Sequence, residues 1–295
     1  MNREPSSTDP DNCDDSAGAC DAPDADSSRV SLWKNTPTLR EAYPVRSYEV
    51  DACGRLSISA LCNFMQDAAG MHAEELGVSV AQLQKQNKTW MLSRLVLQMN
   101  AYPGRQDRLH VTTWPSGIRR LFALRDFLFR DDRNRPLGSA ATAWLIIDMP
   151  TRRPLRVDPF VKHMNPGAQG DQSDPELNLF EKIPESSTYE NELRFRIRYR
   201  DLDINRHVNN VSFIEWVVES LPTNVMHRSM LSGLEINFLA EAFHGDIVIS
   251  KSHPLEDRSG MFLHSVVREA DGQELVRART VWQTMQKDPL GSLLK

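Results

Sequence analysis

Residues 199–220 read YRDLDINRHVNNVSFIEWVVES, and residues 48–69 read YEVDACGRLSISALCNFMQDAA. Aligning Tyr48 with Tyr199 places a strand end, a polar turn and the start of an apolar helix pattern at matching positions in both stretches. A matching order of elements over two long stretches is typical of an internal repeat. The chain is therefore predicted to hold two copies of one α+β unit.

Each copy has one long helix and several strands. Between Ser57 and Gly77, and again between Asn209 and Leu221, apolar residues recur at three- and four-residue steps, as on one face of a helix. Runs rich in β-forming residues flank these helices. They span 93–100, 108–114, 121–130 and 139–148 in the first copy, and 193–199, 234–240, 246–250, 262–268 and 275–283 in the second.

Each unit is expected to wrap a strongly curved antiparallel sheet around its helix. Such a sheet has an exposed edge, and the second copy can cover that edge by continuing the sheet. Gly104 before Asp107 and Gly245 before Asp246 extend the correspondence between the copies, with a small insertion. The predicted fold class is α+β, with two helix-plus-curved-sheet units that form one continuous sheet.

Length and composition fit two compact units. The 295 residues are 40% hydrophobic and 25% charged, which is ordinary globular composition, and domains usually hold about 100–200 residues. A polar stretch at 163–191 contains three prolines and two glycines and is typical of a linker. The predicted boundaries are a tail at 1–28, a first unit at 29–162, the linker at 163–191 and a second unit at 192–295.

The tail at 1–28 carries eight acidic residues against the single base Arg3, so it is expected to be disordered. It lacks the apolar core of a secretory signal and is too acidic for an organelle transit peptide, which favours a cytoplasmic protein. No apolar run approaches the roughly 20 residues that cross a bilayer, so no membrane span is expected. The four cysteines form no Cys-x-x-Cys pair and are expected to be thiols.

Several enzyme classes are excluded by their missing motifs. The sequence has no Gly-x-Gly-x-x-Gly and no Gly-Lys, which argues against dinucleotide-binding and P-loop proteins. It has no Gly-x-Ser-x-Gly and no His-Glu-x-x-His, and its eight histidines are scattered without metal-ligand spacing. No cofactor and no metal are therefore expected.

The polar stretch before the second helix is the strongest candidate for chemistry. Asp203, Asn205 and His207 alternate with Ile204 and Arg206, so in an extended loop the three polar side chains would point the same way. The N–H groups at the start of the following helix would favour an oxyanion beside them. The alternative is that the Asp and Asn shape a turn, that the next Asn caps the helix, and that the His is buried. The presence of all three polar side chains in one short stretch favours the catalytic interpretation.

The pattern Asp203-x-Asn205-x-His207-Val208-Asn209-Asn210-x-x-Phe213-x-x-Trp216 resembles that of the acyl-acyl carrier protein thioesterases, within the hotdog-fold superfamily. Similar segments extend the resemblance from about Tyr43 to Trp282, at Asn63–Ala69, Asn87, Trp90, Arg94, Tyr102-Pro103 and Thr151-Arg152-Arg153. The resemblance implies a tandem hotdog and a cofactor-free thioester hydrolase that releases a free fatty acid from acyl carrier protein.

The resemblance also supplies a fourth catalytic residue, Glu241, on a strand after the second helix. Plant members often follow this Glu with Cys, but Ala242 stands here, so a cysteine nucleophile at that site is excluded. We assign Glu241 and His207 to positioning and deprotonating water, and either could be the general base. Asn205 and the helix-start N–H groups are assigned to the thioester oxygen, and Asp203 to orienting its neighbours.

The alignment indicates that the first copy has lost this polar set. It places Ala52, Gly54 and Leu56 opposite the Asp, Asn and His, and Asn100 opposite the Glu. The first copy is therefore assigned to binding the acyl chain. Four residues of its helix are the candidates for this role: Met65, Ala68, Ala69 and Met71. Each of them is explained equally well as an ordinary core residue. Asp67 on the same helix is an alternative catalytic carboxylate.

The region from Arg94 to Arg156 is strongly basic. It holds twelve Arg, no Lys and five acidic residues, which gives 12 − 5 = +7. Such a surface would attract an acidic carrier protein, or its arginines could simply shield the sheet. The candidates for carrier docking are Arg119, Arg120, Arg152 and Arg153. No nucleic-acid-binding motif is present.

Three other activities compete with carrier-protein hydrolysis. The same site could act on coenzyme A esters, or the protein could bind acyl groups without catalysis. A hotdog dehydratase is disfavoured, since its His-x-x-x-Phe-Pro-Gly pattern is absent. A monomer and a homodimer both remain open, because a tandem repeat already contains the pairing that a single hotdog gains by dimerising.

Overall fold

The computed structural model describes residues 38–157, 177–186 and 188–285, so the predicted tail at 1–28 lies outside the described residues. Eleven strands in the described part form one antiparallel sheet in the order β1-β3-β4-β5-β2-β8-β11-β10-β9-β7, with β6 paired to β5. The strands are β1 (Leu39–Pro44), β2 (Lys88–Met99), β3 (Arg108–Arg119), β4 (Phe122–Arg130), β5 (Pro136–Asp148), β6 (Pro154–Leu155), β7 (Asn191–Arg196), β8 (Ser229–Phe238), β9 (Ile247–Pro254), β10 (Met261–Arg268) and β11 (Glu274–Thr284).

The strand order is that of two copies joined back to back. From the outside inward, β1-β3-β4-β5-β2 of the first copy corresponds to β7-β9-β10-β11-β8 of the second. The copies meet where β2 pairs with β8, and Val96 lies opposite Glu235 there. The predicted continuous sheet is confirmed, and pairing β2 with β8 covers the edge that each unit would otherwise expose.

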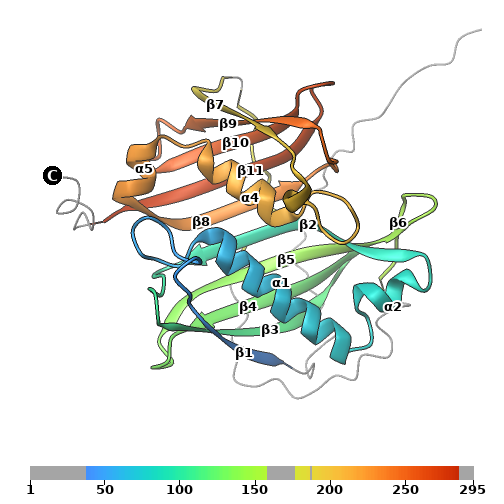
Figure 1. Cartoon of the computed structure of the whole chain (residues 1–295). Helices are drawn as coiled ribbons and strands as arrows, with labels where there is room; N and C mark the ends of the chain where they lie inside the picture. Colours follow the sequence, from blue (N-terminus) through green and yellow to red (C-terminus); the bar gives the residue numbers. More distant parts are fainter. Residues whose placement is uncertain (1–37, 158–176, 187, 286–295) are drawn as a thin grey trace, which may run out of the picture.

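The two long helices lie on the same face of this sheet (Figure 1). Helix α1 (Ile58–Glu75) begins after Ser57, whose side chain accepts a hydrogen bond from the Ala60 N–H, and α4 (Asn210–Glu219) begins after Asn209, which caps the Val211 N–H in the same way. Their apolar faces pack against the sheet and against each other, and a single large core results. Three short helices complete the described fold: α2 (Val80–Gln84), η1 (Tyr199–Asp201) and α5 (Thr223–Arg228).

The internal repeat extends to single residues. The pairing of β2 with β5 shifts at Ser93, between the pairs Leu92–Trp144 and Arg94–Ala143. The pairing of β8 with β11 shifts at the equivalent serine, between Leu231–Trp282 and Gly233–Val281. These matching bulges fix which residues of the two copies are equivalent.

The same comparison corrects the alignment made from the sequence. The Asp51 N–H donates to the Arg55 carbonyl, as the Asp203 N–H donates to the His207 carbonyl. The residues equivalent to Asp203, Asn205 and His207 are therefore Asp51, Cys53 and Arg55, not Ala52, Gly54 and Leu56. The sequence alignment was displaced by one residue because the helix caps Ser57 and Asn209 are one position further apart than the two tyrosines used to align the copies.

The equivalent of Glu241 is also different from the one predicted. The Leu56 N–H donates to the Pro103 carbonyl, and the Val208 N–H donates to the Ala242 carbonyl. The residue before each of these acceptors is Tyr102 in the first copy and Glu241 in the second, so Tyr102 rather than Asn100 is the counterpart. The first copy therefore keeps the aspartate but differs at the other three positions.

Part of the predicted linker packs across the back of the sheet. Leu177 and Leu179 are buried against Val96, Leu124, Ala141 and Ala143. Glu181 pairs with Arg279 of β11 at 2.8 Å, so this segment contacts strands of both copies.

No helix in the described ranges is long and apolar enough to cross a membrane. Cys53 and Cys62 are thiols rather than halves of a disulfide.

Candidate active site

The Asp203–His207 segment is a tight turn. The Oδ1 atom of Asp203 accepts hydrogen bonds from the backbone N–H groups of Asn205 at 2.8 Å and His207 at 3.1 Å. Arg206 has a left-handed backbone with φ 64°. The expectation of an extended loop is therefore wrong, because the carboxylate satisfies two backbone donors and folds the chain back on itself. Asp203 shapes the turn, and the predicted cap at Asn209 is present.

Asn205 is held from both ends of its amide group. Its Nδ2 donates to Asp203 Oδ2 at 3.2 Å, and its Oδ1 accepts from Gln84 Nε2 at 2.8 Å. Gln84 is the last residue of α2, which belongs to the first copy. The first copy therefore fixes the orientation of a polar side chain in the second.

His207 and Glu241 are brought together, although they are 34 positions apart in the sequence. His207 Nδ1 lies 3.4 Å from Glu241 Oε1, and the Glu241 carboxylate also pairs with the Arg152 guanidinium. The imidazole packs edge-on against Phe243, with ring centroids 5.3 Å apart. Glu241 thus lies between a base and a cation, and both partners orient it.

The surroundings favour the neutral form of His207. Burial lowers its pKa below the ordinary 6.5, the Asp203 carboxylate opposes this shift, and the charge of Arg152 adds to it. A neutral imidazole has one nitrogen that can accept a proton. The pair can therefore take a proton from a bound water molecule.

These residues border a cavity of about 1390 Å³, named here the Glu241 cavity, whose lining includes Asp203, Asn205, His207 and Glu241. Its lining continues along the second half of α1 and onto β2, β4 and β5, through Ala69, Ala73, Trp90, Met91, Leu92, Leu124, Trp144 and Ile147. A polar cluster thus opens into a largely apolar space provided by the first copy.

Only one of the four predicted chain-binding residues, Ala69, lines this cavity. Met65 and Ala68 are buried in the main core, and Met71 is 37% exposed. Asp67, the alternative carboxylate, accepts a hydrogen bond from the Tyr43 hydroxyl at 2.9 Å and does not line the cavity. The helix spacing identified the correct helix, but only the packed sheet decides which of its faces meets the cavity.

The four predicted docking arginines divide into two groups. Arg120 and Arg153 are exposed and do not line the Glu241 cavity. The Arg119 guanidinium lies 4.2 Å from the ring centroid of Phe180, and Arg152 is paired with Glu241. Arg152 therefore belongs to the candidate site as well as to the basic surface.

The sequence interpretation missed Gln84 and the role of Arg152. The sequence did contain a signal for the helix that carries Gln84, because Ser79-x-x-Gln82 forms the capping box that begins α2. For Arg152 the sequence offered none, because its contact with Glu241 crosses between the two copies. No group of three or more potential metal ligands is found among residues 38–157, 177–186 and 188–285.

The fold and the site together define a thioesterase of the tandem hotdog class. The family model of the acyl-ACP thioesterase N-terminal domain matches residues 37–163, and that of the C-terminal domain matches residues 184–284. The chain belongs to the acyl-ACP thioesterase family.

Individual relatives agree with this assignment. Oleoyl-acyl carrier protein thioesterase 1, chloroplastic, from Arabidopsis thaliana is 26% identical over 290 residues, which cover 88% of this chain and 80% of that protein. The structure of the 12:0-ACP thioesterase from Umbellularia californica is 25% identical with a TM-score of 0.74, and covers 84% of this chain and 98% of that chain. An acyl-ACP thioesterase from Bacteroides thetaiotaomicron is also 25% identical, with a TM-score of 0.67 and coverage of 83% and 98%.

Proposed function

We propose that this protein hydrolyses the thioester of acyl-acyl carrier protein and releases the free fatty acid. The observation that carries the proposal is the contact between His207 and Glu241 at the border of a large cavity whose first-copy lining is mostly apolar. Its volume of about 1390 Å³ exceeds the roughly 300–1,000 Å³ of ordinary small-ligand pockets. That leaves room for an acyl chain together with the arm that carries the thioester.

In this proposal His207 and Glu241 hold the attacking water and remove its proton. The water oxygen forms a bond to the thioester carbon, and the carbonyl electrons move onto the oxygen. Asn205 and the N–H of Asn210, the first residue of α4, stabilise that oxygen. Collapse of the intermediate breaks the C–S bond. Because a thiol has a pKa of about 8.5, it leaves without a strong general acid.

The proposed acyl donor is a carrier protein. The region between Arg94 and Arg156 has a net charge of +7, from twelve Arg and five acids, and an acidic partner would be steered toward it. Arg120 and Arg153 are the exposed members of the predicted docking set that do not line the Glu241 cavity. If carrier docking occurs there, changing both to Glu should raise KM for acyl-ACP but not for acyl-CoA. Equal increases in KM for the two donors would contradict carrier docking at this surface.

Release of free thiol from acyl-ACP and acyl-CoA tests the activity directly. Replacing His207 or Glu241 with Ala should lower turnover at least ~100-fold, the lower range for one acid–base group, while the circular dichroism spectrum is kept. His110→Ala is a matched control, because it removes an exposed pair of the same kind, with His110 Nε2 2.8 Å from Asp132 Oδ1. Near-wild-type turnover of Glu241→Ala would exclude Glu241 from the reaction.

A further inference from the structure

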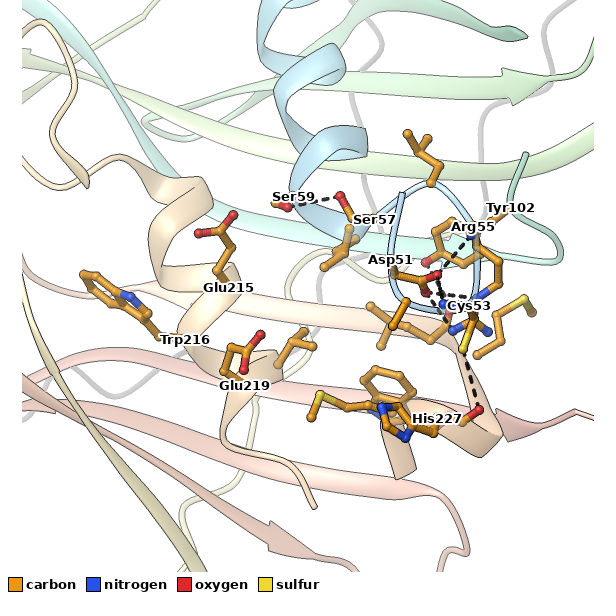
Figure 2. Close-up of a pocket in the computed structure, with 18 of the residues that line it drawn as sticks. Asp51, Cys53, Arg55, Ser57, Ser59, Tyr102, Glu215, Trp216, Glu219 and His227 are labelled. Atoms are coloured by element: carbon orange, nitrogen blue, oxygen red, sulfur yellow. Dashed lines mark hydrogen bonds and ion pairs between the residues drawn. The ribbon is translucent and has the colours of Figure 1, made fainter. Parts of the chain in front are cut away.

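A second cavity of about 940 Å³, named here the Tyr102 cavity, lies between residues 51–59 and the second half of α4. Figure 2 shows Asp51, Cys53, Arg55 and Tyr102 on one side of it, and Glu215, Trp216 and Glu219 of α4 on the other. The four residues of the first group are the equivalents of Asp203, Asn205, His207 and Glu241. The Tyr102 cavity is thus the counterpart, in the internal repeat, of the Glu241 cavity.

The apolar linings of the two cavities correspond residue by residue. Met91, Leu92 and Trp144 line the Glu241 cavity, and their equivalents Met230, Leu231 and Trp282 line the Tyr102 cavity. The tryptophans also make the same contact, each donating its indole N–H to a threonine two residues earlier, at 2.9 Å and 3.0 Å. The second cavity has therefore kept the apolar wall of the first.

The residues at the positions of His207 and Glu241 have changed in a way that removes the general base from both. Arg55, in the place of His207, donates to Asp51 Oδ2 from Nε at 3.0 Å and from Nη2 at 2.8 Å, and a guanidinium cannot accept a proton. Tyr102, in the place of Glu241, donates its hydroxyl to the Leu231 carbonyl at 2.9 Å, and burial raises its pKa far above the ordinary value. The cavity has no general base at either equivalent position.

One side of the cavity, along β7 and just after it, carries arginines. Arg194, Arg196 and Arg198, spaced two residues apart, all line the cavity. Arg194 pairs with Glu269 and Arg198 with Asp201. Within residues 38–157, 177–186 and 188–285, no carboxylate lies within ion-pair distance of Arg196. An anionic group would be attracted to the β7 side and repelled from the α4 side, where the two glutamates lie (Figure 2).

We propose that the Tyr102 cavity binds one unesterified long-chain fatty acid without chemical change, with its chain along Met230, Leu231 and Trp282 and its carboxylate at Arg196. The proposal rests on the proposed function only for the expectation that the Glu241 cavity takes the same chain. The ligand would be the product class of the reaction, held at a second place on the same protein.

The number of oleate molecules bound tests both cavities. Titration calorimetry should find two equivalents for the wild type and one for each of Met230→Trp and Met91→Trp, a matched pair of half-buried positions. One equivalent in the wild type, lost in Met91→Trp and kept in Met230→Trp, would overturn the proposal and leave the Glu241 cavity intact. The reverse pattern would instead sink the assignment of the acyl chain to the Glu241 cavity.

Labelling of Cys53 tests the proposal without filling the cavity. In a Cys13→Ser, Cys20→Ser background, maleimide should react at the half-buried Cys53, because burial raises the pKa of Cys62 to about 12. Oleate at ten times its Kd leaves about one eleventh of the cavities empty, so labelling should slow about 10-fold. An unchanged rate would contradict binding, and equal protection by methyl oleate would contradict the role given to the carboxylate.

Discussion

Replacing Arg152 with Gln is expected to move the acid limb of the activity profile to higher pH. His207 can take a proton only while it is neutral, and the charge of Arg152 helps to hold its pKa below 6.5. Without that charge, the Glu241 and Asp203 carboxylates act on His207 unopposed, and Glu241 Oε1 lies 3.4 Å from His207 Nδ1. Opposite unit charges at this distance attract by about 1.2 kcal/mol in water, which corresponds to ~0.9 pKa unit. That value is an upper bound because partial exposure screens the pair, so the expected shift is about half a unit.

The profile of kcat/KM against pH measures this shift, since it reports the ionisation of the free enzyme. Thiol release would be followed from pH 5 to pH 8.5 for the wild type, Arg152→Gln and Arg153→Gln. The last variant removes the same charge one residue away, from an exposed side chain, and should keep the acid limb where the wild type has it. An unmoved or lowered limb in Arg152→Gln, or the same shift in both variants, would refute the electrostatic argument.

Three further predictions follow from the site and its surroundings. Ala69→Trp should shift acyl preference toward shorter chains, because Ala69 lines the cavity, whereas Met71→Trp should not, because Met71 is exposed; equal profiles would contradict this. Gln84→Ala should lower turnover about 3- to 10-fold, because Asn205 loses one neutral hydrogen bond. Wild-type turnover in this variant would show that Gln84 does not orient Asn205 for the reaction. Burial lowers the pKa of His264 to about 3, so its contribution to stability is present above pH 6.5 and is lost by about 1.4 kcal/mol per pH unit below it. His264→Gln should flatten the fall of Tm between pH 6.5 and pH 4, and an equally steep fall would contradict that.

The long elements could be predicted because their signals are local. The helix expected at Ser57–Gly77 spans Ile58–Glu75, and the one expected at Asn209–Leu221 spans Asn210–Glu219. Each has an apolar stripe wide enough to define its buried face and a side chain that caps its first turn. The short helices α2 and α5 were missed, because five or six residues are too few to show a helical period.

Residue equivalence between the copies could not be predicted, because it depends on hydrogen bonds rather than on residue identity. Aligning the two tyrosines gave a register displaced by one, so Ala52, Gly54 and Leu56 were taken in place of Asp51, Cys53 and Arg55. The contact of Arg152 with Glu241 was out of reach for a related reason. It joins a turn after β5 to the loop after β8, since Glu241 lies three residues beyond Phe238, the last residue of β8, and not on a strand as expected. Only pairing β2 with β8 brings those two regions together.

The corrected equivalence changes what Asp203 is expected to do. Asp51 holds its own turn as Asp203 does, with Oδ1 accepting from the Cys53 N–H at 2.9 Å and the Arg55 N–H at 3.0 Å. An aspartate kept in both turns, only one of which carries a histidine, acts first on the shape of the turn. Asp203→Asn retains an oxygen for the two backbone donors, so it should keep at least ~10-fold more turnover than Asp203→Ala, in line with the cost of leaving donors unsatisfied. The comparison uses thiol release by folded variants, and equal losses would show that the carboxylate charge itself takes part in hydrolysis.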